Sequence, residues 1–136
     1  MTHDHRRAGF TLLDVLIAVS IVAILASLAL PSFRDAFQRG RRVDAMTSLL
    51  SVQVAQERWR ANHTTYADLD ALGWSDTSTE GHYQLRLDEI SAGSFFATAE
   101  PHADGTQVGD ACGTFALDQR GPVVTTEYAD GACWRR

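Results

Sequence analysis

Residues 9–30 read GFTLLDVLIAVSIVAILASLAL, and this stretch decides how the chain is organised. The 16 residues from Val15 to Leu30 carry no charge, whereas Asp14 stands immediately before them. As a helix, residues 10–30 would be about 31 Å long, which matches the hydrocarbon core of a bilayer. We therefore predict a membrane-length helix with a carboxylate near its start.

The apolar run is not closed like a secretory signal peptide, which ends at a small-residue cleavage site. Instead Pro31 follows, and then a continuing helical pattern. A proline inside a helix removes a hydrogen bond and bends the axis. We therefore expect the segment to be retained, with a helix kink at Pro31.

Beyond Gly40 the helical pattern becomes amphipathic. Apolar residues recur at spacings of three and four, which predicts one apolar stripe that packs on a small head. We expect Met46 to lie in the core and the helix, about fifty residues long, to end near Asn62. The stripe is predicted to comprise Val43, Met46, Leu50 and Val54, with Arg41, Arg42, Asp44, Gln53 and Glu57 largely off it.

The remainder of the chain indicates short strands. Alternating or β-branched runs bounded by turn residues predict strands at 83–87, 95–99 and 113–117, with a possible fourth at 123–126. Consecutive strands with short connections favour an antiparallel sheet, one face of which is buried against the helix. The expected fold class is therefore α+β.

The two cysteines, Cys112 and Cys133, favour a disulfide, because the apolar N-terminal segment points to an oxidising compartment. Two buried free thiols are the alternative. The net charge of −5 argues against a general nucleic-acid binder. All twelve basic residues are arginine, which excludes cross-links through lysine.

Residues 9–17, GFTLLDVLI, closely resemble the class III signal of type IV prepilins and pseudopilins. The resemblance implies that a membrane peptidase cuts between Gly9 and Phe10 and that Phe10 becomes the methylated N-terminus. Asp14 stands where that family normally has glutamate. It is thereby implicated in subunit assembly, through the N-terminal ammonium of a neighbouring subunit.

Two further stretches resemble PilE-type minor pilins, namely residues 56–66 and residues 112–121 together with Cys133-Trp134. The resemblance implies the type IV pilin fold, in which a long N-terminal helix packs on a small antiparallel sheet and a disulfide closes a C-terminal loop. It divides the chain into a cleaved leader (1–9), a transmembrane and assembly half-helix (10–30), an amphipathic half-helix (31–62) and a periplasmic head (63–136).

The implied function is that of a structural minor subunit of a type IV pilus, which contributes to pilus biogenesis, twitching motility, adhesion or DNA uptake. Such a subunit first spans the inner membrane with its N-terminus in the cytoplasm and later enters the extracellular pilus. Its implied partners are other pilin subunits, the prepilin peptidase and the pilus assembly machinery. The arginines after the apolar run would by themselves favour the opposite orientation, whereas the cysteine pair agrees with this one.

Two alternatives share parts of this pattern. A pseudopilin of a type II secretion system has the same N-terminal motif, and a calcium-binding acidic loop in the head would favour it. A signal-anchored periplasmic binding module would keep residues 1–9 and need no methylation. Because His63, His82 and His102 lie far apart in sequence and no nucleophile stands near a histidine, we predict no enzyme, no metal site and no cofactor.

Overall fold

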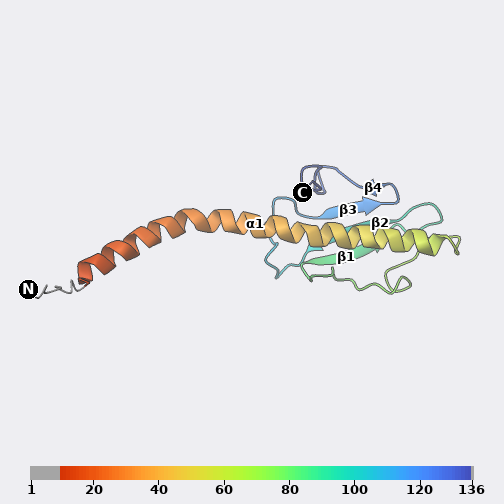
Figure 1. The fold of residues 1–136 in the computed structure, drawn as a ribbon. Coiled ribbons are helices and arrows are strands. Elements are labelled where there is room, and N and C mark those ends of the chain that lie inside the picture. The colour runs from red at the N-terminus through yellow and green to blue at the C-terminus, as the bar shows by residue number, and fades with distance from the viewer. Residues whose placement is uncertain (1–9, 136) are drawn as a thin grey trace, which may run out of the picture. The chain divides into compact units, whose positions relative to one another are not determined.

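The computed structural model describes residues 10–135, apart from the side chains of residues 30–32. One long helix precedes a small sheet (Figure 1). The elements are α1 (Leu12–Arg60), β1 (Tyr83–Asp88), β2 (Phe96–Pro101), β3 (Phe115–Asp118) and β4 (Gly121–Pro122). The chain divides into two compact units with a boundary between Ala36 and Phe37, and α1 contributes to both. The predicted α+β fold is confirmed.

In the first unit, α1 is apolar on all sides. It is long and apolar enough to cross a membrane, and none of its most apolar window is buried within the structure. The hydroxyls of Ser20 and Ser27 donate to the carbonyls of Leu16 and Ile24, at 2.8 and 2.7 Å, so these polar groups need no solvent. Pro31 lies within the bounds of α1, and the kink predicted there stays a prediction.

The second unit, from Phe37 onward, holds the hydrophobic core. The four strands form an antiparallel sheet in the order β1-β2-β3-β4, and the later part of α1 crosses it (Figure 1). Alternation along the strands turns one face of the sheet toward the helix. The core joins Ala45, Met46, Leu49 and Val52 of α1 to Tyr83, Leu85, Ala97, Ala99, Phe115 and Leu117 of the sheet.

Three polar side chains on the buried face of α1 bind the loops of the head. Asp44, 4% exposed, accepts hydrogen bonds from Ser78 Oγ at 2.6 Å and from the amides of Glu80 and His82 at 2.9 and 3.2 Å. Three further contacts act in the same way: Ser48 Oγ accepts from Thr79 N, Gln56 Nε2 donates to Ala67 O, and Gln56 Oε1 accepts from Ala67 N. Because every one of these groups is paired, their burial stabilises one fixed position of the loops.

The helix prediction was right about the length of α1 but wrong about its buried face. Leu50 and Val54, predicted for the core, are 44% and 50% exposed, whereas Leu49 and Val52 are 1% exposed. Met46 does lie in the core, at 7% exposed, but Asp44, predicted off the stripe, is buried. The spacing of apolar residues predicted the wrong face because the face that is buried also contains polar residues. These polar residues, Asp44, Ser48 and Gln56, pair with backbone groups of the loops.

The fourth strand was also predicted at the wrong place. Residues 123–126 are not a strand, and β4 is instead the two residues Gly121–Pro122 directly after a tight turn. Gly121 pairs with Asp118 and has a φ of 125°, a conformation that glycine adopts easily. Val124 is 50% exposed, so this β-branched side chain does not pack against the core as a strand residue would.

The turn before β4 is stabilised by charge. Asp118 Oδ1 accepts from the amide of Arg120 at 2.7 Å, and the Arg120 guanidinium binds Oδ2 at 3.0 Å. Burial acts to raise the pKa of Asp118, but the backbone and side-chain hydrogen bonds from Arg120 outweigh it and lower that pKa below its usual value. The carboxylate therefore stays ionised and keeps the turn closed.

Candidate functional site

The first turn of α1 is closed by reciprocal hydrogen bonds between Thr11 and Asp14. Asp14 N donates to Thr11 Oγ1 at 3.2 Å, and Thr11 N and Oγ1 donate to Asp14 Oδ2 at 3.0 and 2.8 Å. This arrangement is a capping box, with aspartate in the position that glutamate or glutamine usually takes. Asp14 therefore helps to start the helix, a role that the sequence analysis did not predict.

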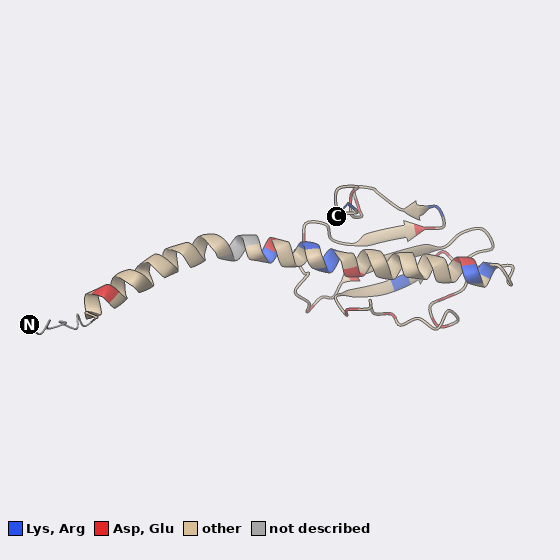
Figure 2. Cartoon of the chain, in the orientation of Figure 1, with Lys and Arg blue, Asp and Glu red and all other residues tan. Residues whose placement is uncertain are grey.

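Phe10 precedes this turn and is 86% exposed. The predicted methylation site thus lies directly before the helical turn that holds the predicted assembly carboxylate. Figure 2 shows one acidic band at the start of α1, where Asp14 is the acidic residue of the first turn. The next charged residues in the sequence are Arg34 and Asp35. The cleavage position after Gly9, like the rest of the leader (1–9), lies outside the described residues.

The predicted disulfide is confirmed, since Cys112 is joined to Cys133 with their Cα atoms 5.8 Å apart. The bridge ties the last segment to the sheet, where the Trp134 ring lies edge-on to Phe115 with ring centroids 5.3 Å apart. Asp130 Oδ1 accepts from Ala132 N and Cys133 N, at 2.8 and 2.9 Å, and so shapes the turn that carries the second cysteine.

A polar cluster fastens the loop before Cys112 to the helix. Arg42 binds Asp110 through two hydrogen bonds, of 2.9 Å from Nε and 2.5 Å from Nη2. Gln107 Nε2 donates to Tyr83 Oη at 2.9 Å. Burial raises the pKa of Tyr83, so its hydroxyl stays protonated and serves as a structural partner.

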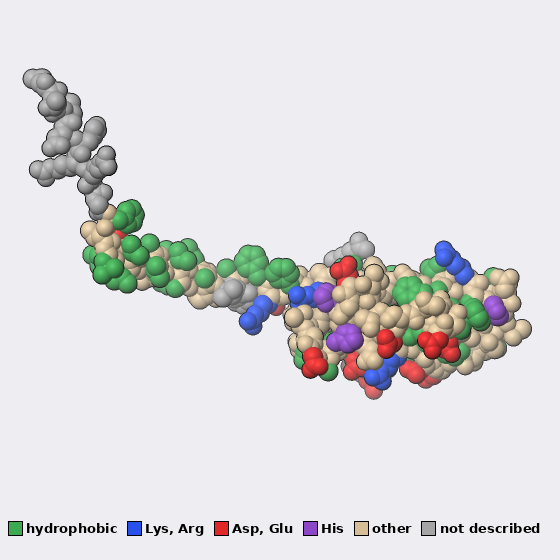
Figure 3. Space-filling model, turned by 90° about the horizontal axis from the view of Figure 1, so that it is seen from below, with side chains coloured by type: hydrophobic (Ala, Val, Ile, Leu, Met, Phe, Trp, Pro, Cys, Tyr) green, Lys and Arg blue, Asp and Glu red, His purple; other side chains and the backbone are tan. Residues whose placement is uncertain are grey.

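The head has an open groove along the exposed face of α1, about 460 Å³ in volume. It is formed by Thr47, Leu50, Ser51, Val54, Ala55 and Arg58 with Trp74 from the following loop. Figure 3 shows other apolar side chains gathered along the first unit of the chain. Two residues that the sequence analysis assigned to the core thus belong to a surface.

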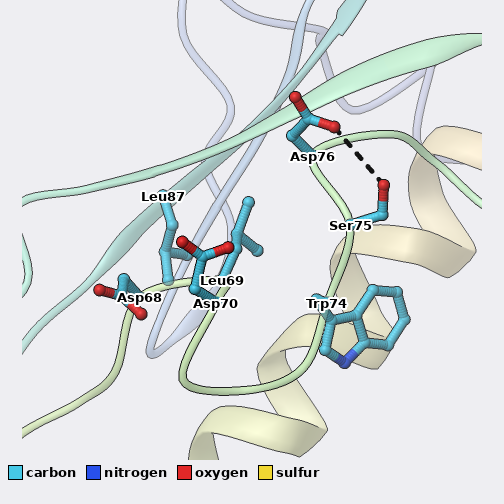
Figure 4. A pocket seen from close by; sticks show the side chains of 7 residues that line it. All are labelled: Asp68, Leu69, Asp70, Trp74, Ser75, Asp76 and Leu87. Atoms are coloured by element: carbon cyan, nitrogen blue, oxygen red, sulfur yellow. Dashed lines mark hydrogen bonds between the residues drawn. The ribbon is translucent and has the colours of Figure 1, made fainter.

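A second recess, about 520 Å³, has an acidic rim formed by Asp68, Asp70 and Asp76 beside Trp74 (Figure 4). The Asp68 carboxylate accepts from Ala71 N at 2.8 Å, and Asp76 Oδ1 accepts from Thr77 Oγ1 at 3.3 Å. The three carboxylates do not converge on one point in Figure 4. Among residues 10–135, no three His, Cys, Asp or Glu side chains are grouped so that they could hold a metal ion.

Comparison with known proteins decides the family. The family described as "Type IV minor pilin ComP, DNA uptake sequence receptor" matches residues 31–116, which is more than half of the chain, and the prokaryotic N-terminal methylation motif matches residues 4–30. This chain belongs to the type IV minor pilins. The family and the fold of this minor pilin are those of structural pilins.

Individual relatives include a type IV pilin and a type II secretion protein. The minor pilin is 35% identical over 63 residues to the type IV major pilin protein PilA of Myxococcus xanthus, a match that covers 46% of this chain and 29% of the relative. It is 27% identical over 116 residues to the type II secretion system core protein G of Vibrio cholerae, covering 78% of this chain and 80% of the relative. The minor pilin therefore spans less than a third of the first relative's length and most of the second's.

A solved structure shares the fold of the minor pilin. It is the non-core minor pilin PilV of Neisseria meningitidis, with a TM-score of 0.54 and 21% identity over 71% of this chain and 97% of that one. At this identity the likeness bears on the fold alone.

Proposed function

We propose that this minor pilin is synthesised with the leader 1–9, is cut by the prepilin peptidase between Gly9 and Phe10, and is methylated on Phe10. The observation that carries the proposal is the overlap of a methylation motif over residues 4–30 with the exposed apolar part of α1. Thr11 keeps its amide after such a cut, so the capping box with Asp14 is compatible with the mature chain.

In this proposal the parts of the chain act in sequence. Residues 10–30 hold the subunit in the inner membrane, residues 31–62 join the membrane to the head, and residues 63–136 form a periplasmic head. A disulfide in the head supports this orientation, because such bonds persist in oxidising compartments. The pilus assembly machinery then transfers the helix from lipid into a filament of other pilin subunits, so the apolar surface stays away from water.

The carboxylate of Asp14 is proposed to pair with the N-terminal ammonium of a neighbouring subunit during assembly. Asp14 Oδ2 takes both hydrogen bonds from Thr11, and Oδ1 accepts none from the residues that the structure describes. The side chain can therefore keep the helix capped while it offers a second oxygen to a cation. In a water-free core such a pair is strongly favoured over either charge alone.

The proposal predicts that Asp14→Ala lowers incorporation into pili more than it lowers membrane insertion. The control is Asp14→Glu, which keeps the charge and the usual capping-box residue. Membrane fractions and sheared filaments from a host expressing each variant are compared by immunoblot. Normal amounts of Asp14→Ala in filaments would contradict the assembly role.

Intact-mass analysis of protein from the native host tests processing separately. We expect a chain that begins at Phe10 and carries one added methyl group. A mature chain that still contains residues 1–9 would instead support a signal-anchored binding module and would overturn the filament proposal.

A type II secretion pseudopilin is the second candidate, favoured by the match to core protein G. Location separates the two, since a pilus subunit is recovered with sheared surface filaments and a pseudopilin is not. The family description also raises DNA uptake for this chain. We expect weak binding to random duplex DNA because residues 37–136 carry 14 acidic residues against nine arginines. Tight binding of one sequence in a mobility-shift assay would support a receptor role.

A further inference from the structure

A recess with an apolar floor and a cationic rim lies beside the disulfide in the second unit, about 520 Å³ in volume. Val43, Met46 and Cys133 line it, and Arg39 and Arg135 border it from the helix and from the C-terminal segment. It is separate from the open groove and from the acidic recess, because it shares no lining residue with either.

The two rim arginines differ from the third arginine of the recess in how their charges are balanced. Arg42 is held by Asp110 in an ion pair. Arg39 and Arg135 form no salt bridge with any residue between 10 and 135. The nearby Asp130 carboxylate is already occupied by two backbone amides of its own turn. The recess therefore offers two guanidinium groups to an anion.

The positive charge of these arginines contrasts with the net negative charge of the rest of the head. Residues 37–136 contain 14 acidic residues and nine arginines, yet Arg39, Arg41 and Arg42 follow one another within four positions of α1. Figure 2 shows basic bands on α1, and in the sequence this basic cluster begins at the third residue of the second unit. Three arginines so close in sequence to a membrane-length segment form a local cationic surface, which attracts anionic headgroups.

The length of chain between the recess and the apolar run is short. Arg39 is nine residues after Leu30, which is at most about 13 Å along a helix. The polar headgroup layer on one side of a bilayer is about 5–7 Å thick and accounts for that part of the distance. Arginine side chains are long enough to span the rest, with the charged group directed to the headgroups and the stem on apolar surface.

We propose that this recess binds the headgroup of an anionic phospholipid while residues 10–30 lie in the membrane, with the phosphate between Arg39 and Arg135 and the glycerol on the apolar floor. The inference rests on the membrane stage of the proposed function. Guanidinium groups pair well with phosphate oxygens. A recess of this size with an apolar floor fits a single headgroup better than a duplex, whose phosphates require an extended cationic surface.

The experiment uses the full chain in phosphatidylcholine nanodiscs that contain a phosphatidylglycerol with a photoactivatable group on its glycerol. After illumination, mass spectrometry measures the yield of lipid cross-links to residues 39–46 and 132–135. We expect cross-links there, and about fivefold less yield for each rim arginine that is replaced. The test variant is the double substitution Arg39→Gln/Arg135→Gln.

The matched control is Arg58→Gln/Arg86→Gln, which removes the same charge from exposed positions elsewhere on the head. Its cross-linking should equal that of the unchanged chain. A second variant, Gly40→Leu, fills the recess without changing charge, and a Cβ at Gly40 meets no atom within 4 Å, so the fold should persist. We expect Gly40→Leu to lower the yield as well.

Three results would overturn the proposal. These are equal yields from photoactivatable phosphatidylcholine, equal losses in the Arg58/Arg86 control, or displacement of the lipid by inorganic phosphate or by a duplex of about 20 base pairs. The last would identify a free-anion or nucleic-acid site instead. The assay requires only that the chain enters a membrane, so its outcome is independent of peptidase cleavage and filament location, which test the proposed function.

Discussion

At the scale of single residues, Asp44 shows how one buried carboxylate organises the loop between α1 and β1. It accepts from one hydroxyl and two backbone amides, on a helix face that is otherwise mostly apolar. The loop could not approach the helix so closely if these three donors lacked an acceptor, because burying an unpaired polar group is costly. Asp44 thus determines where the chain enters the sheet.

We predict that Asp44→Ala destabilises the head by on the order of 3 kcal/mol, since each buried donor left without a partner costs about 1–3 kcal/mol and some regain water. Urea unfolding of the full chain in neutral detergent, followed by near-ultraviolet circular dichroism, measures the change. Asp35→Ala, on the exposed part of the same helix, is the control. An Asp44→Ala midpoint equal to that of the control would show that the loop does not depend on the carboxylate.

At the scale of elements, α1 presents two different faces within the head. Leu49 is 1% exposed and its neighbour Leu50 is 44% exposed. We predict that Leu49→Ala costs about 2–5 kcal/mol because it leaves a cavity in the core. Leu50→Ala should change stability by less than about 0.5 kcal/mol. Equal effects in the same urea assay would mean that the helix is rotated from the orientation described here.

The disulfide is the second element-scale feature. It joins residues 21 apart, and closing a loop of this size stabilises a fold by about 3 kcal/mol in the chain-entropy model. We predict that Cys112→Ser/Cys133→Ser lowers the free energy of unfolding by about this amount. Addition of a reductant to the unchanged chain should have the same effect. No change in the unfolding midpoint on reduction would contradict the prediction.

At the scale of the whole molecule, the two units differ in what they need from their surroundings. The first exposes apolar side chains along its length, whereas the second has its own core. We predict that a chain cut to residues 37–136 is soluble and monomeric without detergent and forms the Cys112–Cys133 bond. Sedimentation and thiol titration measure this. Aggregation of the oxidised fragment would show that the head depends on the preceding segment.

The sequence could predict the features that depend on local patterns, but not those that depend on contacts between distant residues. The long helix and three strands follow from local patterns of apolar and polar residues, and the disulfide follows from the single pair of cysteines together with the oxidising compartment that the apolar segment indicates. The buried face of α1 could not be derived in this way, because Asp44, Ser48 and Gln56 are buried through hydrogen bonds to loops distant in sequence. The capping role of Asp14 follows from the three-residue spacing of Thr11 and Asp14, but aspartate stands where a capping box usually has glutamate or glutamine, so the residue pattern alone did not indicate it.

The position of the second cysteine has a consequence for the order of events in the cell. Cys133 follows every strand of the sheet, so a head that crosses the membrane from residue 31 onward delivers all four strands before the cross-link can form. In the proposed orientation, formation of this bond therefore indicates that all four strands have reached the oxidising side of the membrane. A subunit exported only as far as Cys112 still carries an unpaired thiol.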